Sequence, residues 1–148
     1  MSKVENAVLI WGPVSSEGIN YLRFQGKEVV VCENRPYLLG LIHNKPLLEK
    51  EGFRIVYCPD NAIGHLFYKN AVREVVLFCR KEKGIIKGIS GSLYVWLLAK
   101  LHSLPVKIFQ QAEINWDKIK DLNASTLEGN LMVEPGNIEP VEFEAIEL

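Results

Sequence analysis

The stretch that decides the fold is EVVLFC at residues 74–79, a run of apolar, β-branched and aromatic side chains with no polar alternation. A strand that is apolar throughout is buried on both faces, which is typical of a parallel sheet covered by helices. Similar runs stand at nearly regular intervals around it, at residues 7–11 (AVLIW), 28–32 (EVVVC), 53–58 (FRIVYC) and 106–109 (VKIF). Segments of helix length separate these runs, as successive β-α-β crossovers require. We therefore predict an α/β fold, a single doubly wound (Rossmann-like) domain with a mainly parallel sheet of at least five strands.

Capping residues mark where the predicted helices begin, because their side chains can accept hydrogen bonds from free backbone N–H groups. The candidates are Ser15 or Ser16, Asp60 or Asn61, and Ser90 or Ser92. The first helix runs to residue 25 with Ile19, Leu22 and Phe24 facing the sheet, and the second covers residues 62–70. The longest helix ends near residue 102, with Leu93, Trp96, Leu97 and Leu101 at helical spacing. Pro46 is expected to interrupt residues 37–51, so that a turn or short helix precedes the helix proper. A short helix is also expected over residues 115–123.

Composition places the chain among ordinary globular domains. Its 148 residues are 48% hydrophobic and 24% charged, which excludes the disordered and collagen-like classes. No apolar run approaches the about 20 residues of a membrane span, and the first residues lack a secretion signal. Cys32, Cys58 and Cys79 have no paired or metal-type spacing and are interpreted as reduced core thiols. We expect a cytoplasmic protein with no metal, cofactor or membrane contact.

The net charge of −1 hides an asymmetry along the chain. Residues 1–109 carry 15 Lys and Arg against 9 Asp and Glu, whereas residues 110–148 carry 2 against 9. A mildly basic body argues against direct nucleic-acid binding, which usually needs a strongly basic domain. It is compatible with a small anionic ligand, although ordinary surface charge explains it equally well. The acidic segment 110–148 is expected to pack on the surface of the domain.

Functional residues are expected at one edge of the sheet. In doubly wound folds the ligand crevice lies at the carboxyl ends of the strands. The loops predicted there are residues 12–16, 33–36, 59–65, 80–92 and 110–113.

Several segments of the sequence resemble one superfamily, in matching order and spacing. They are ENRP at residues 33–36 followed by Leu39-Gly40, DNAIGHL at 60–66, the run from SGS at 90–92 to LAKLHSLP at 98–105, and VEP at 133–135 with EP at 139–140. The superfamily comprises the regulatory subunits of translation initiation factor 2B, methylthioribose-1-phosphate isomerase and ribose-1,5-bisphosphate isomerase. The resemblance covers most of residues 7–148. It implies that residues 1–148 form the family's Rossmann-like domain without its N-terminal helical domain.

The catalytic positions of the isomerases are changed in this chain. The family's ring opening and proton transfer use a cysteine after the first strand and an aspartate after the fourth, where this sequence has Gly12 and Arg80. Glycine has no side chain and a guanidinium cannot act as a base at neutral pH. The family's phosphate-binding lysine is Ile89 here, and its glutamine after Arg-Pro is Leu39. The small-residue loop at 12–16 is similar to that of the initiation-factor subunits, which do no chemistry.

The resemblance therefore implies a non-catalytic domain that dimerises and binds a phosphorylated metabolite, a sugar phosphate or a nucleotide. Tyr94, Trp96 and Leu97 cannot all face one sheet, which favours a homodimer surface on the longest helix. The alternative is an aldose–ketose isomerase-like enzyme with altered residues, using Asp60, His65 or Cys79.

We predict no catalytic residue and no metal ligand. The predicted ligand-binding residues are Ser15, Ser16, Arg35, Asp60, Arg80, Ser90, Gly91 and Ser92. Structural alternatives stay open for several of them: Arg35 could pair with Glu33 or Asp60, and Asp60 could cap its helix. The basic segment that starts at Arg80 could be a solvated loop, and Cys79 could be an inert buried thiol.

Overall fold

A parallel five-stranded sheet forms the centre of the computed structural model, which describes residues 4–82, 85–118 and 141–144. The five strands are paired in the order β3, β2, β1, β4, β6. Their bounds are Ile55–Cys58 for β3, Val29–Cys32 for β2, Ala7–Trp11 for β1, Val72–Glu82 for β4 and Val106–Gln110 for β6. The predicted doubly wound, mainly parallel sheet is confirmed.

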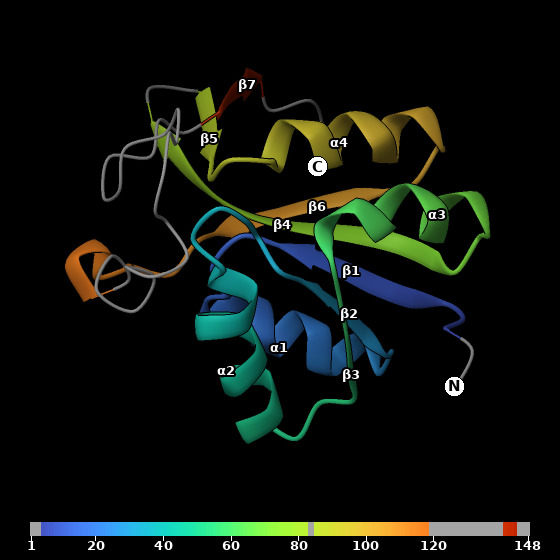
Figure 1. Ribbon diagram of the computed structural model, residues 1–148, viewed down its shortest axis with the longest axis horizontal. Helices are drawn as coiled ribbons and strands as arrows, with labels where there is room; N and C mark the ends of the chain where they lie inside the picture. The colour runs from blue at the N-terminus through green and yellow to red at the C-terminus, as the bar shows by residue number, and fades with distance from the viewer. Residues whose placement is uncertain (1–3, 83–84, 119–140, 145–148) are drawn as a thin grey trace.

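Helices cover both faces of this sheet (Figure 1). On one face α1 (Ser16–Gln25) and α2 (Lys45–Lys50) pack on side chains such as Val76 and Phe78. On the other face α3 (Ile63–Tyr68) and α4 (Ser92–Leu101) pack on their β4 neighbours Val75 and Leu77. Successive β4 residues therefore serve two different cores, which is why their apolar run has no alternation.

The predicted loop at residues 80–92 is wrong in its first half. Strand β4 continues to Glu82, and β5 (Ile85–Gly88) returns antiparallel to it, with Arg80 opposite Lys87. Strand β7 (Val141–Glu144), from the acidic segment, pairs antiparallel with β5. The hairpin is stabilised because Ile86 is buried in the α3–α4 core.

In two helices, the buried face differs from the predicted one. Phe24 is 87% exposed, because the buried stripe of α1 is Gly18, Ile19 and Leu22. In α4 the buried residues are Ser92, Val95 and Ala99, so the large residues Leu97 and Leu101 face solvent. Small side chains at the buried positions let this helix lie close to the sheet.

A short helical segment precedes the helix that contains Pro46, as predicted, although no break separates the two. A π-helical segment (Gly40–Asn44) runs directly into α2, and Pro46 stands in the first turn of α2, at the junction of the two segments. The segment after β3 is a 3-10 turn (Asp60–Ala62) followed by α3, so that helix ends earlier than predicted. The helix predicted at residues 115–123 is seen as helical over 116–118, and its remainder lies outside the described residues.

No helix in the described part of the chain is both long and apolar enough to cross a membrane.

Candidate ligand site at the carboxyl edge

The loop after β1 is fixed by two buried asparagines. Asn34 Oδ1 accepts the Gly12 N–H at 2.8 Å. Asn44 Oδ1 accepts the Val14 N–H at 2.9 Å, and Asn44 Nδ2 donates to the Gly12 carbonyl at 2.9 Å. A ring nitrogen of His43 is 3.0 Å from the Val14 carbonyl oxygen. These backbone groups are therefore engaged within the protein, and they position the loop instead of facing a ligand.

Gly12 occupies a position that excludes any side chain. Its φ is +94°, and a Cβ built there would collide with the carbonyl oxygen of Phe78. The end of β1 and the end of β4 can approach this closely only because residue 12 is glycine. The position at which the isomerase resemblance implies a cysteine thus has no room for one.

The Asp60 carboxylate binds backbone N–H groups of the loop after β2. Its Oδ1 accepts the Asn34 N–H and its Oδ2 accepts the Arg35 N–H, each at 2.8 Å. The carboxylate makes no hydrogen bond that caps the turn it begins, so the predicted helix cap is wrong. Burial raises the pKa of Asp60, and the two N–H donors oppose that rise by favouring the ionised form. Asp60 is a positioning residue for the Arg35 loop in this structure.

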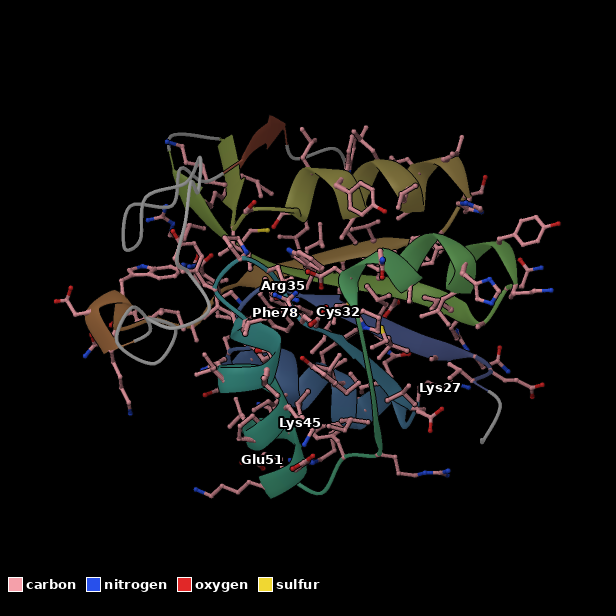
Figure 2. All side chains as sticks on the ribbon, viewed as in Figure 1. Lys27, Cys32, Arg35, Lys45, Glu51 and Phe78 are labelled. Atoms are coloured by element: carbon pink, nitrogen blue, oxygen red, sulfur yellow. The ribbon has the colours of Figure 1, made fainter. Side chains whose placement is uncertain are left out.

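Arg35 lies in the loop that follows β2 (Figure 2), and its guanidinium is exposed. Nε and Nη2 donate to Glu33 Oε2 at 3.2 and 2.9 Å, so of the two ion pairs considered the one with Glu33 is present. The Arg35 side chain is nevertheless 59% exposed. A surface pair of this kind is worth about 0–1 kcal/mol. The guanidinium can therefore exchange this carboxylate for another anion at little cost.

The start of α4 is joined to the end of β1. Trp11 Nε1 donates to the Ser90 carbonyl at 3.2 Å, and a Cβ at Gly91 would collide with the Trp11 ring. The Ser92 N–H donates to the Ile89 carbonyl at 3.0 Å. The Ser92 hydroxyl is fully enclosed and lies against Gly88, with no hydrogen-bond partner among the described residues. Only Ser90 and Gly91 of this predicted trio keep some exposure toward a ligand.

The two other predicted serines belong to the loop after β1. The Ser15 hydroxyl is buried and has no hydrogen-bond partner in the described structure, and it does not cap α1. Ser16 is the first residue of α1 and is exposed.

The basic residues of the β4–β5 hairpin lie beside a small cleft. Arg80 and Lys87 are direct cross-strand partners, so their side chains share one face of the hairpin. The cleft has a volume of about 140 Å³ and is lined by Cys79, Arg80, Lys81, Ile86, Ile108, Phe109 and Gln110. Lys83, also part of the predicted basic loop, lies outside the described residues.

Cys79 and His65, two of the residues considered for catalysis, line different clefts. Burial raises the pKa of Cys79 to about 12, so this thiol stays protonated at neutral pH and is a poor nucleophile. His65 is exposed on α3 and lines an open cleft of about 480 Å³ with Val4, Leu66, Lys69 and Ala71, not with the site loops. The described residues contain no group of three or more His, Cys, Asp and Glu side chains that could hold a metal ion.

Sequence reasoning missed the positioning role of Asn34, Asn44 and His43. Asn34 directly follows a buried strand, and an asparagine there is a recognisable signal, since it tolerates a left-handed backbone. Asn44 gives no such signal, because its burial depends on the π-helical turn that carries it inward.

The sequence matches no protein-family profile and no curated protein. The fold, in contrast, is similar to solved structures. Translation initiation factor eIF-2B subunit delta from A. fulgidus aligns with a TM-score of 0.68 and 18% identity, over 95% of this chain and 50% of that one. A 5-methylthioribose 1-phosphate isomerase from Pyrococcus horikoshii aligns with a TM-score of 0.67 and 14% identity, over 94% and 46%.

A third structure, the P. horikoshii initiation factor eIF-2B, gives a TM-score of 0.56 and 16% identity over 93% of this chain and 50% of that chain. The chain thus spans about half the length of these solved structures. The resemblance expected from the sequence is confirmed at the level of the fold: the chain has the Rossmann-like α/β fold found in eIF-2B subunits and in methylthioribose-1-phosphate isomerase.

Proposed function

We propose that this chain is a non-catalytic, cytoplasmic eIF-2B-like domain that binds a phosphorylated small molecule at the carboxyl edge of the sheet and pairs with a second copy of itself. The ligand is a sugar phosphate or a nucleotide, and it contacts Arg35 together with Ser90 and Gly91. Arg80 and Lys87 supply further positive charge. No nucleic acid or membrane contact is part of this function.

The observation that carries the proposal is the exposed guanidinium of Arg35 on a rigidly held loop. Asp60 fixes the Arg35 backbone through two 2.8 Å hydrogen bonds, and buried Asn34 ties the same loop to Gly12. A pre-organised donor loses little entropy on binding, and a guanidinium matches phosphate geometry through two parallel hydrogen bonds. Ligands of doubly wound folds bind at this edge.

Replacing Arg35 with alanine is expected to weaken binding of a phosphate ester by about 1.5–3 kcal/mol, the range for a hydrogen bond to a charged group. The affinity of the unchanged protein should also fall as salt concentration rises. Calorimetric titration with sugar phosphates and nucleotides, preselected by thermal shift, measures both effects.

Two variants sharpen the Arg35 titration. Arg54→Ala removes an arginine that is 86% exposed and precedes β3, at the opposite edge of the sheet, and should leave the affinity unchanged. Glu33→Gln should strengthen binding, because it removes the carboxylate that competes for the guanidinium while keeping an oxygen for the Asp60 N–H. An unchanged affinity in Arg35→Ala would overturn the proposed site.

We expect no turnover of methylthioribose 1-phosphate or ribose 1,5-bisphosphate. Gly12 has no room for a thiol, and Arg80 has no basic lone pair at neutral pH. Product analysis by NMR after prolonged incubation with each sugar checks this expectation. Turnover at enzymatic rates that disappears in Arg35→Ala would contradict it and favour the isomerase alternative.

Pairing with a second copy is proposed through the outward face of α4. This face carries Tyr94, Leu97 and Leu101, which are 48%, 52% and 76% exposed, at helical spacing. A helix that is apolar on its inner and outer faces is typical of one buried on both sides.

Sedimentation at micromolar concentration should therefore give a dimer. The double substitution Leu97→Lys and Leu101→Lys should convert it to a monomer, since four like charges would meet in the interface. The substitution Phe24→Lys changes an apolar residue on α1 that is even more exposed, in the opposite helix layer, and should not affect the dimer. A monomeric unchanged protein would refute this pairing.

A further inference from the structure

Two cysteines face each other at the carboxyl ends of β2 and β3. Cys32 and Cys58 are the last residues of these strands, they are direct register partners, and their sulfurs are 3.9 Å apart. Neighbouring strands lie about 4.8 Å apart, which is within the about 4.4–6.8 Å Cα separation that a disulfide spans. Side-chain rotation alone can therefore bring the sulfurs into bonding distance.

The two thiols differ in access and in acidity. Cys32 is fully buried in the interior of the sheet, whereas Cys58 is 8% exposed and lies on β3, an edge strand of the described sheet. The hydrogen bond between the sulfurs lowers the pKa of Cys58 and raises that of Cys32, as a Cys32 S–H donor stabilises the Cys58 thiolate. Cys58 is thus the thiol suited to attack and Cys32 the one suited to resolve.

We propose that Cys32 and Cys58 form a reversible dithiol–disulfide pair that is oxidised by hydrogen peroxide. The Cys58 sulfur attacks one peroxide oxygen, the O–O bond breaks, and the hydroxide released takes a proton to become water. This step leaves a sulfenic acid on Cys58. The Cys32 sulfur then attacks the Cys58 sulfur, the S–O bond breaks, and the Cys32 proton leaves in a second water. Two thiols lose two electrons and peroxide is reduced to two waters; a dithiol reductant reverses the change.

The cysteine pair is connected to the candidate site by hydrogen bonds and by the chain itself. The Cys32 carbonyl accepts a hydrogen bond from Asn34 Nδ2 at 3.1 Å. Cys58 stands two residues before Asp60, which holds the Asn34 and Arg35 N–H groups. A disulfide would join the two strands whose following loops form this network. The chemistry of the pair does not depend on the proposed ligand, so the two proposals can fail separately.

The test uses the full reduced chain, treated with equimolar hydrogen peroxide at pH 8 and then alkylated under denaturing conditions. We expect two of the three thiols to be lost, and the intact mass measured before alkylation to fall by two hydrogens. Peptide mapping should recover a Cys32–Cys58 linked peptide and an alkylated Cys79. Dithiothreitol should restore all three thiols.

Two variants and a comparison with the guanidinium-unfolded chain complete the test. Cys79→Ser should still lose two thiols, whereas Cys58→Ser should form no intramolecular disulfide. The peptide mapping described above uses the unchanged chain, so its result does not depend on whether either variant folds. The proposal is overturned if Cys32 and Cys58 remain alkylatable under conditions that oxidise the guanidinium-unfolded chain, or if Cys58 is only over-oxidised or linked to a second chain.

Discussion

Replacing Gly12 with alanine is expected to lower the free energy of unfolding by about 3–5 kcal/mol, from backbone strain and steric overlap together. The φ of +94° is a conformation that side-chain-bearing residues rarely adopt. The added Cβ would also collide with the Phe78 carbonyl oxygen, which is backbone and cannot rotate away. Denaturant unfolding followed by tryptophan fluorescence measures the loss. The cysteine substitution Gly12→Cys should cost at least as much.

Two other glycines separate the causes in this experiment. Gly26 has a φ of +62° but open space around it, so Gly26→Ala should show the backbone cost alone, about 1–2 kcal/mol. Gly64 lies inside α3 with open space and no positive φ, so Gly64→Ala should stabilise the chain by about 0.5–1 kcal/mol. If Gly12→Ala lowers the free energy of unfolding no more than Gly26→Ala does, the loop after β1 can shift to make room for the added Cβ. The steric argument against a thiol at this position would then be wrong.

The parallel core of the fold could be predicted because its signal is local. Each parallel strand is an apolar run, and burial on both faces leaves little other interpretation for such a run. The β4–β5 hairpin escaped prediction because its register depends on the partner strand and on the distant β7. The sequence shows the apolar spacing of α4 but does not show which side of the helix faces the sheet. That choice is made by the small residues Ser92 and Ala99, whose close packing only the fold reveals.

The place of the candidate site and the contacts of its residues depend on different information. The edge follows from topology, which places the loops after all parallel strands together. The hydrogen-bond partners of Asp60 cannot be derived from the topology. The strand register, which places Cys32 beside Cys58, decides whether Asp60 bonds its own helix or the Asn34 and Arg35 N–H groups. The engagement of Arg35 by Glu33 was one of two stated alternatives, and only the geometry of the loop decides between them.

Replacing Asn34 with alanine is expected to lower the free energy of unfolding by about 3–5 kcal/mol. Asn34 is buried, and its side chain satisfies the Gly12 N–H and the Cys32 carbonyl, two backbone groups that cannot reach solvent. Each buried group left without a partner costs about 1–3 kcal/mol. The φ of +57° adds about 1–2 kcal/mol for an alanine. Unfolding in guanidinium, followed by circular dichroism, gives the difference.

Asn70 provides a matched control for this substitution. It has almost the same backbone conformation, with a φ of +56°, but its side chain is exposed after α3. Asn70→Ala should therefore lose only the conformational part, about 1–2 kcal/mol. Asn34→Gly removes the same two hydrogen bonds without the conformational penalty, so its loss should be smaller than that of Asn34→Ala by about 1 kcal/mol. Equal losses in Asn34→Ala and Asn70→Ala would mean that water or a shifted loop satisfies the Gly12 N–H. The loop after β1 would then not be held by Asn34, and the rigidity on which the Arg35 site depends would have to come from Asp60 alone.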